Sequence, residues 1–68
     1  MKLVKVSGEC GKDDCPAVYT TDRGSLVVQG ALLTEDHDIA PAAGEALVEI
    51  PYSVLLEAAG AVGRYRLA

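Results

Sequence analysis

The chain has 68 residues, of which 50% are hydrophobic and 24% are charged, and it contains neither Phe nor Trp. This length fits one small domain, residues 1–68, and excludes a multidomain enzyme, while the apolar content is too high for a disordered chain. Six basic and ten acidic residues give a net charge of −4, the wrong sign for a protein that binds nucleic acid by neutralising phosphates.

The first half of the chain predicts short strands. Leu3–Val6 alternates apolar and charged residues, which is typical of a strand. After a polar loop over residues 7–14, the segments Pro16–Thr20 and Ser25–Gln29 flank a short turn that ends in Gly24. Glycine adopts the left-handed backbone conformation that such turns need, so this stretch predicts a β-hairpin.

The middle of the chain predicts a break, a loop and a further strand. Gly30 indicates a bend or bulge before residues 31–33. Residues 34–44 show no periodicity and carry three acids, a Pro and a Gly, so we expect an exposed loop. The alternation in Glu45–Ile50 predicts another strand.

A helix is predicted from about Pro51 to Val62. Proline is tolerated in the first turn of a helix, and Gly63 followed by basic residues is a typical helix end. The apolar residues of one predicted helical stripe are Tyr52, Leu55, Leu56, Ala59 and Val62.

These elements predict an α+β fold: a small, mainly antiparallel sheet of three or four strands with the C-terminal helix packed on it. A chain this short buries only about 60% of its unfolded surface, so we also expect a homodimer, formed through an edge strand such as Ser25–Gln29. The predicted core residues are Val4, Val6, Val18, Leu26, Val28, Leu47 or Val48, Ile50, Leu55, Leu56 and Ala59.

Acidic residues dominate the second half of the chain. Every charged side chain between residues 35 and 57 is acidic: Glu35, Asp36, Asp38, Glu45, Glu49 and Glu57. Such a segment either keeps the surface soluble or attracts a basic protein surface. We predict that Glu35, Asp36, Asp38 and Ile39 bind a protein partner.

The two cysteines, Cys10 and Cys15, are separated by four residues, unlike the two-residue spacing of thioredoxin-like or most zinc sites. The sequence shows no membrane span and no apolar signal region, so we expect a cytoplasmic protein with free thiols. A metal site formed by Cys10, Cys15 and His37 and a reversible disulfide are alternatives.

Catalytic residues are scarce. His37, the only histidine, lies in the polar loop between two aspartates, and no glycine pattern matches a phosphate-binding loop. We therefore predict a protein that is not an enzyme and has no cofactor.

The order of segments resembles a known group of proteins. "CPAVYTTDRGSLVVQG", an acidic loop and "EALVEIPYSVLLEAA" resemble small actinobacterial proteins of unknown function encoded beside helix-turn-helix regulators, of the BldB-like and WhiJ-associated type. The resemblance implies a non-catalytic partner of a transcription regulator, in an antitoxin-like or developmental role. A direct DNA-binding dimer using Lys2, Lys5, Arg64 and Arg66 is the alternative.

Overall fold

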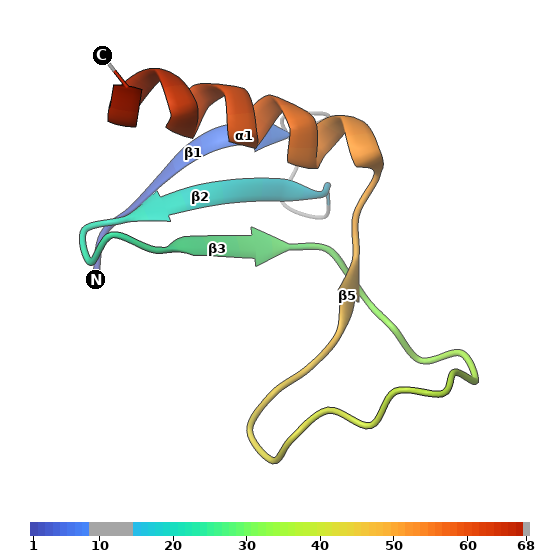
Figure 1. Ribbon diagram of the computed structural model, residues 1–68. Helices are drawn as coiled ribbons and strands as arrows, with labels where there is room; N and C mark the ends of the chain where they lie inside the picture. The colour runs from blue at the N-terminus through green and yellow to red at the C-terminus, as the bar shows by residue number, and fades with distance from the viewer. Residues whose placement is uncertain (9–14, 68) are drawn as a thin grey trace.

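The computed structural model describes residues 1–8 and 15–67, with side chains described as far as residue 63. It confirms an α+β fold, in which a three-stranded antiparallel sheet carries one helix and a two-stranded antiparallel ribbon extends from it (Figure 1). The elements in chain order are β1 (Leu3–Gly8), β2 (Ala17–Thr21), β3 (Leu26–Gln29), β4 (Ala31–Leu32), β5 (Val48–Glu49) and α1 (Tyr52–Leu67).

The larger sheet has the order β1-β2-β3, with β2 in the centre. Strand β1 pairs with β2 from Leu3 opposite Thr21 to Gly8 opposite Ala17, and its register shifts at a bulge between Lys5 and Ser7. Helix α1 lies across one face of this sheet, running back toward the β2–β3 turn (Figure 1). We call α1 and the three strands β1, β2 and β3 the body.

The core of the body is small and lies where α1 crosses β1 and β2. Val18, Val54 and Ala58 are buried against one another, and Val6 and Ile50 pack around them. Ser7 is also buried, and its Oγ donates a hydrogen bond of 2.9 Å to the carbonyl oxygen of Val54. This bond joins β1 to the first turn of the helix and satisfies the one buried polar side chain among the described residues.

The prediction of which face of the helix is buried is wrong. Val54 and Ala58 are buried, whereas Leu55, Leu56 and Ala59 are exposed, with Leu56 keeping 70% of its surface accessible. Residues 52–63 include a single charged residue, Glu57, so apolar side chains occur all round the helix. Periodicity alone does not select the buried face of such a helix.

Three predicted core residues of the sheet are also exposed. Val4, Leu26 and Val28 keep 40% or more of their surface accessible, although Val28 pairs with the buried Val18. Helix α1 contacts mainly β1 and β2, so Leu26 and Val28 on β3 lie beyond its cover, whereas Val4 lies near the start of β1, where the helix does not bury it. Among the remaining core candidates, Val18 is buried, and Leu47 is half-buried while Val48 is 41% exposed.

Two glycines were predicted to mark element boundaries, and one of them does. Gly24 has the positive φ of 74° predicted for the β2–β3 turn, and the Oγ1 atom of Thr21 accepts hydrogen bonds from the backbone N–H groups of Arg23 and Ser25. Gly63, however, does not end the helix, which continues to Leu67.

Within the described residues, no helix combines the length and apolar character needed to cross a membrane.

Candidate functional site

The most exposed part of the molecule is an arm, residues 31–49, which consists of β4, a long loop and β5. It projects away from the body at the end of the sheet opposite the β2–β3 turn (Figure 1). Every side chain from residue 34 to residue 46 is exposed. A long exposed loop on a folded base is a common location for binding residues.

The base of the arm is held by a short antiparallel ladder. Ala31 pairs with Glu49 and Leu32 with Val48, and the N–H of Leu33 donates to the carbonyl oxygen of Leu47 at 2.9 Å. Gly30 precedes this ladder at a point of close approach. A Cβ atom at Gly30 would lie 2.5 Å from the carbonyl oxygen of Glu49, so only glycine fits there without a shift of the chain.

All four predicted partner-binding residues lie on the loop of this arm. Glu35, Asp36, Asp38 and Ile39 are exposed, and Ile39 keeps 58% of its surface accessible. The N–H of Ile39 donates to Nδ1 of His37 at 3.2 Å, which fixes a local turn. The loop therefore presents carboxylates beside an accessible apolar side chain.

Acidic and basic side chains are concentrated at different ends of the molecule. Between residues 31 and 60 the chain carries six acidic side chains and neither lysine nor arginine. Lys2 lies just before β1 and Lys5 lies within it, while Arg23 lies in the β2–β3 turn beside Asp22. Lys2 precedes Leu3, which pairs with Thr21 at that turn. The arm end is thus acidic, and the turn end carries most of the described basic residues.

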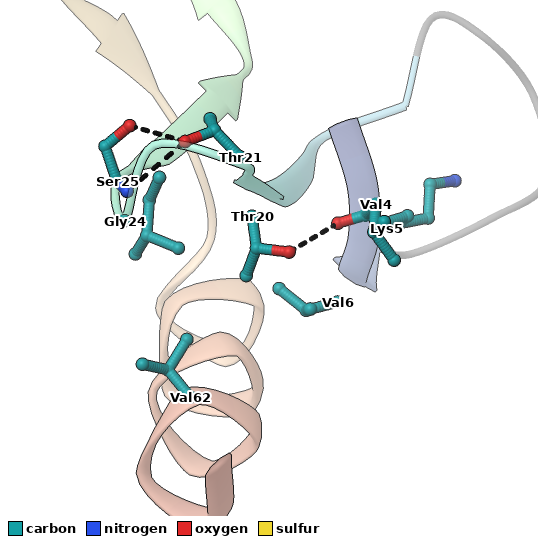
Figure 2. Close-up of a pocket in the computed structure, with 9 residues that line it drawn as sticks. Val4, Lys5, Val6, Thr20, Thr21, Gly24, Ser25 and Val62 are labelled. Atoms are coloured by element: carbon teal, nitrogen blue, oxygen red, sulfur yellow. Dashed lines mark hydrogen bonds between the residues drawn. The ribbon is translucent and has the colours of Figure 1, made fainter. Parts of the chain in front are cut away.

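A cleft of about 580 Å³ lies at the turn end, between the sheet and the later part of α1 (Figure 2). Its walls are mainly apolar, with Val6 and Val62 on opposite sides, and the hydroxyl of Thr20 donates to the carbonyl oxygen of Val4 at 3.5 Å. The described residues that line it include no acid, histidine or cysteine that could act as a catalytic base or nucleophile. The lining residues are Val4, Lys5, Val6, Thr20, Thr21, Gly24, Ser25, Leu26 and Val62.

The expectation of free thiols is wrong for Cys15, which is disulfide-bonded, while Cys10 lies outside the described residues. The compartment decides whether a disulfide persists, whereas the local geometry decides which cysteines can form one. The carbonyl oxygen of Cys15 accepts a hydrogen bond of 3.0 Å from Nε2 of Gln29, so this residue is fixed beside the sheet. Disulfides are typical of oxidising compartments, and the cytoplasmic location stays a prediction.

Metal binding gains no support from the described residues, among which no three His, Cys, Asp or Glu side chains form a group able to hold an ion. A sulfur in a disulfide is also not the thiolate that a metal prefers. The predicted set of Cys10, Cys15 and His37 therefore stays a hypothesis, because Cys10 lies outside the described residues.

Comparison with protein-family models, curated proteins and solved structures finds no match to this chain. Fold and surface define a class, a small α+β domain with a projecting acidic arm. Its function is therefore inferred from the residues and their arrangement.

Sequence reasoning missed one surface, the outer face of α1. Tyr52 and Leu56 keep 90% and 70% of their surface accessible, and Leu55 and Ala59 lie exposed on the same side of the helix. The signal was present in the sequence, since residues 52–63 include only one charge. A helix without a polar face is normally covered on both sides.

Proposed function

We propose that this protein is a non-catalytic binding module whose acidic arm binds a basic surface of another protein, a helix-turn-helix transcription regulator. The observation that supports this most directly is the position of Glu35, Asp36, Asp38 and Ile39 together on a loop exposed throughout its length. The class of partner follows from the resemblance of residues 15–59 to proteins encoded beside such regulators.

The physical basis of the interaction is long-range attraction followed by local apolar contact. Carboxylates at one end of a molecule raise the rate at which a basic surface approaches them. Ile39 then supplies an apolar side chain at the centre of the contact, which is where binding energy concentrates. A regulator binds DNA through its own basic surface, so the arm would compete with DNA for that surface.

The test is a gel-shift titration with the candidate regulator and its operator. Such a regulator is found by co-purification from the native cell. We expect the protein to release the operator, with less release as salt rises, because the attraction is screened. The triple variant Glu35→Gln, Asp36→Asn, Asp38→Asn loses this effect, whereas a matched control, Asp22→Asn with Glu57→Gln, keeps it.

Two results would contradict the proposal. One is release of the operator by the triple variant at the same concentration as by the wild type. The other is direct binding of the protein alone to DNA at physiological salt, which favours the alternative that uses Lys2, Lys5, Arg64 and Arg66.

A further inference from the structure

The outer face of α1 is an apolar stripe with no cover among the described residues. Tyr52, Leu55, Leu56 and Ala59 follow the i, i+3, i+4, i+7 spacing that places side chains along one side of a helix. Tyr52 is 90% exposed, Leu56 is 70% exposed and Leu55 is 51% exposed. On the opposite side, Val54 and Ala58 pack on the sheet, so the sheet covers only one side of this helix.

The chain exposes more surface than a compact monomer of its size. The chain exposes 5456 Å², whereas a compact monomer of its 7.1 kDa mass exposes about 4,100 Å². The exposed arm and the exposed helix stripe both contribute to this excess. A standard interface takes about 800 Å² from each partner, so an excess of about 1,400 Å² leaves room for one interface on the molecule.

We propose that a second copy of this chain covers the stripe, with the two α1 helices antiparallel about a two-fold axis. The stripe is bulky at its start, where Tyr52 lies, and small at its end, where Ala59 lies. An antiparallel pair places Tyr52 of one copy against Ala59 of the other and Leu55 against Leu56. The large Tyr52 side chain of each copy thus packs on the small Ala59 side chain of the other copy. The contact is the same in both directions, as a two-fold interface requires.

Charge supports the same orientation. One end of each molecule carries the acidic arm, whereas the other end carries Lys2 and Arg23 beside a single acid, Asp22. Antiparallel helices bring the acidic end of one copy toward the basic end of the other, whereas parallel helices would bring like charges together. The helix dipoles also oppose each other in the antiparallel pair. The stripe itself is separate from the arm, and only the orientation of the pair uses the charge of the arm, so the inference does not depend on the proposed function.

The first test is sedimentation at micromolar concentration, with circular dichroism to verify the fold. We expect the wild type at twice the 7.1 kDa monomer mass. Leu56→Glu, which places a charge on an already exposed position, weakens the dimer at least tenfold, about 1.4 kcal/mol. Leu32→Glu, a matched change of an apolar residue that is 62% exposed at the base of the arm, leaves it unchanged.

The second test measures the register of the helices. Positions 52 and 59 lie about 10 Å apart along one helix, too far for a disulfide within one chain. The double variant Tyr52→Cys, Ala59→Cys therefore cross-links two copies on oxidation, whereas Tyr52→Cys alone and the wild type do not. A folded monomer at micromolar concentration overturns the proposal. A dimer that Leu56→Glu leaves intact also overturns it and points instead to pairing through the edge strand β3.

Discussion

The body and the arm of this protein differ in how deeply their side chains are buried, although both contain many apolar residues. In the body, Val18, Val54 and Ala58 are buried and Ser7 is hydrogen-bonded inside. In the arm, only Leu33 and Leu47 are half-buried, and the loop between them is exposed throughout. The buried contacts that stabilise the domain therefore lie in the body, and the arm contributes few of them.

The largest expected effect is on the core of the body. Val18→Ala removes two methyl groups from a fully buried site between the sheet and α1, and we expect a loss of about 2–3 kcal/mol in the free energy of unfolding. Urea denaturation of both proteins at equal concentration measures it. A loss below about 0.5 kcal/mol would mean that the core is not where the domain is held together.

The junction between body and arm gives the next largest effect. Gly30→Ala places a Cβ atom 2.5 Å from the carbonyl oxygen of Glu49, so β5 must move. We expect a cost of about 2 kcal/mol, within the range for overpacked sites. Gly63→Ala is the control, because a Cβ atom there meets nothing within 4 Å. Equal stability of the Gly30 variant and wild type in urea would show that the arm is not tied to the body.

A smaller effect is expected where β1 meets the helix. Ser7→Ala removes the 2.9 Å hydrogen bond to the carbonyl oxygen of Val54, and we expect a loss of about 1 kcal/mol. Thr20→Val is the control, because it removes a longer and more exposed bond, of 3.5 Å, between the same two strands of the sheet. If both substitutions lower the thermal unfolding temperature equally, the burial of Ser7 adds nothing to the contribution of its hydrogen bond.

The smallest effect on stability is expected in the arm itself. Replacing residues 34–44 by a short Gly-Ser link removes no buried side chain, so the free energy of unfolding should change by less than about 0.5 kcal/mol. The same variant should lose binding to the regulator while keeping the helix-paired dimer. Loss of stability together with binding would contradict the separation of the two roles.

Several features followed from the sequence because they depend on local chemistry. The β2–β3 turn ends in a glycine with positive φ, as the residue order predicts, and α1 begins directly after Pro51. The exposed loop with Glu35, Asp36, Asp38 and Ile39 was also predictable, since it lacks periodicity and carries charge. These signals act over a few residues, and no distant contact competes with them.

Other features were decided only by the tertiary structure. The sequence offered two apolar sides of α1, and the buried side is set by contact with Val18 and Ser7, far away in the chain. The exposure of Leu26 and Val28 likewise depends on which strands the helix covers. By itself the sequence determined the order of strands and helix, the β2–β3 turn and the acidic loop. The choice of buried face required the elements to pack, because apolar burial is not directional and follows whichever surfaces meet.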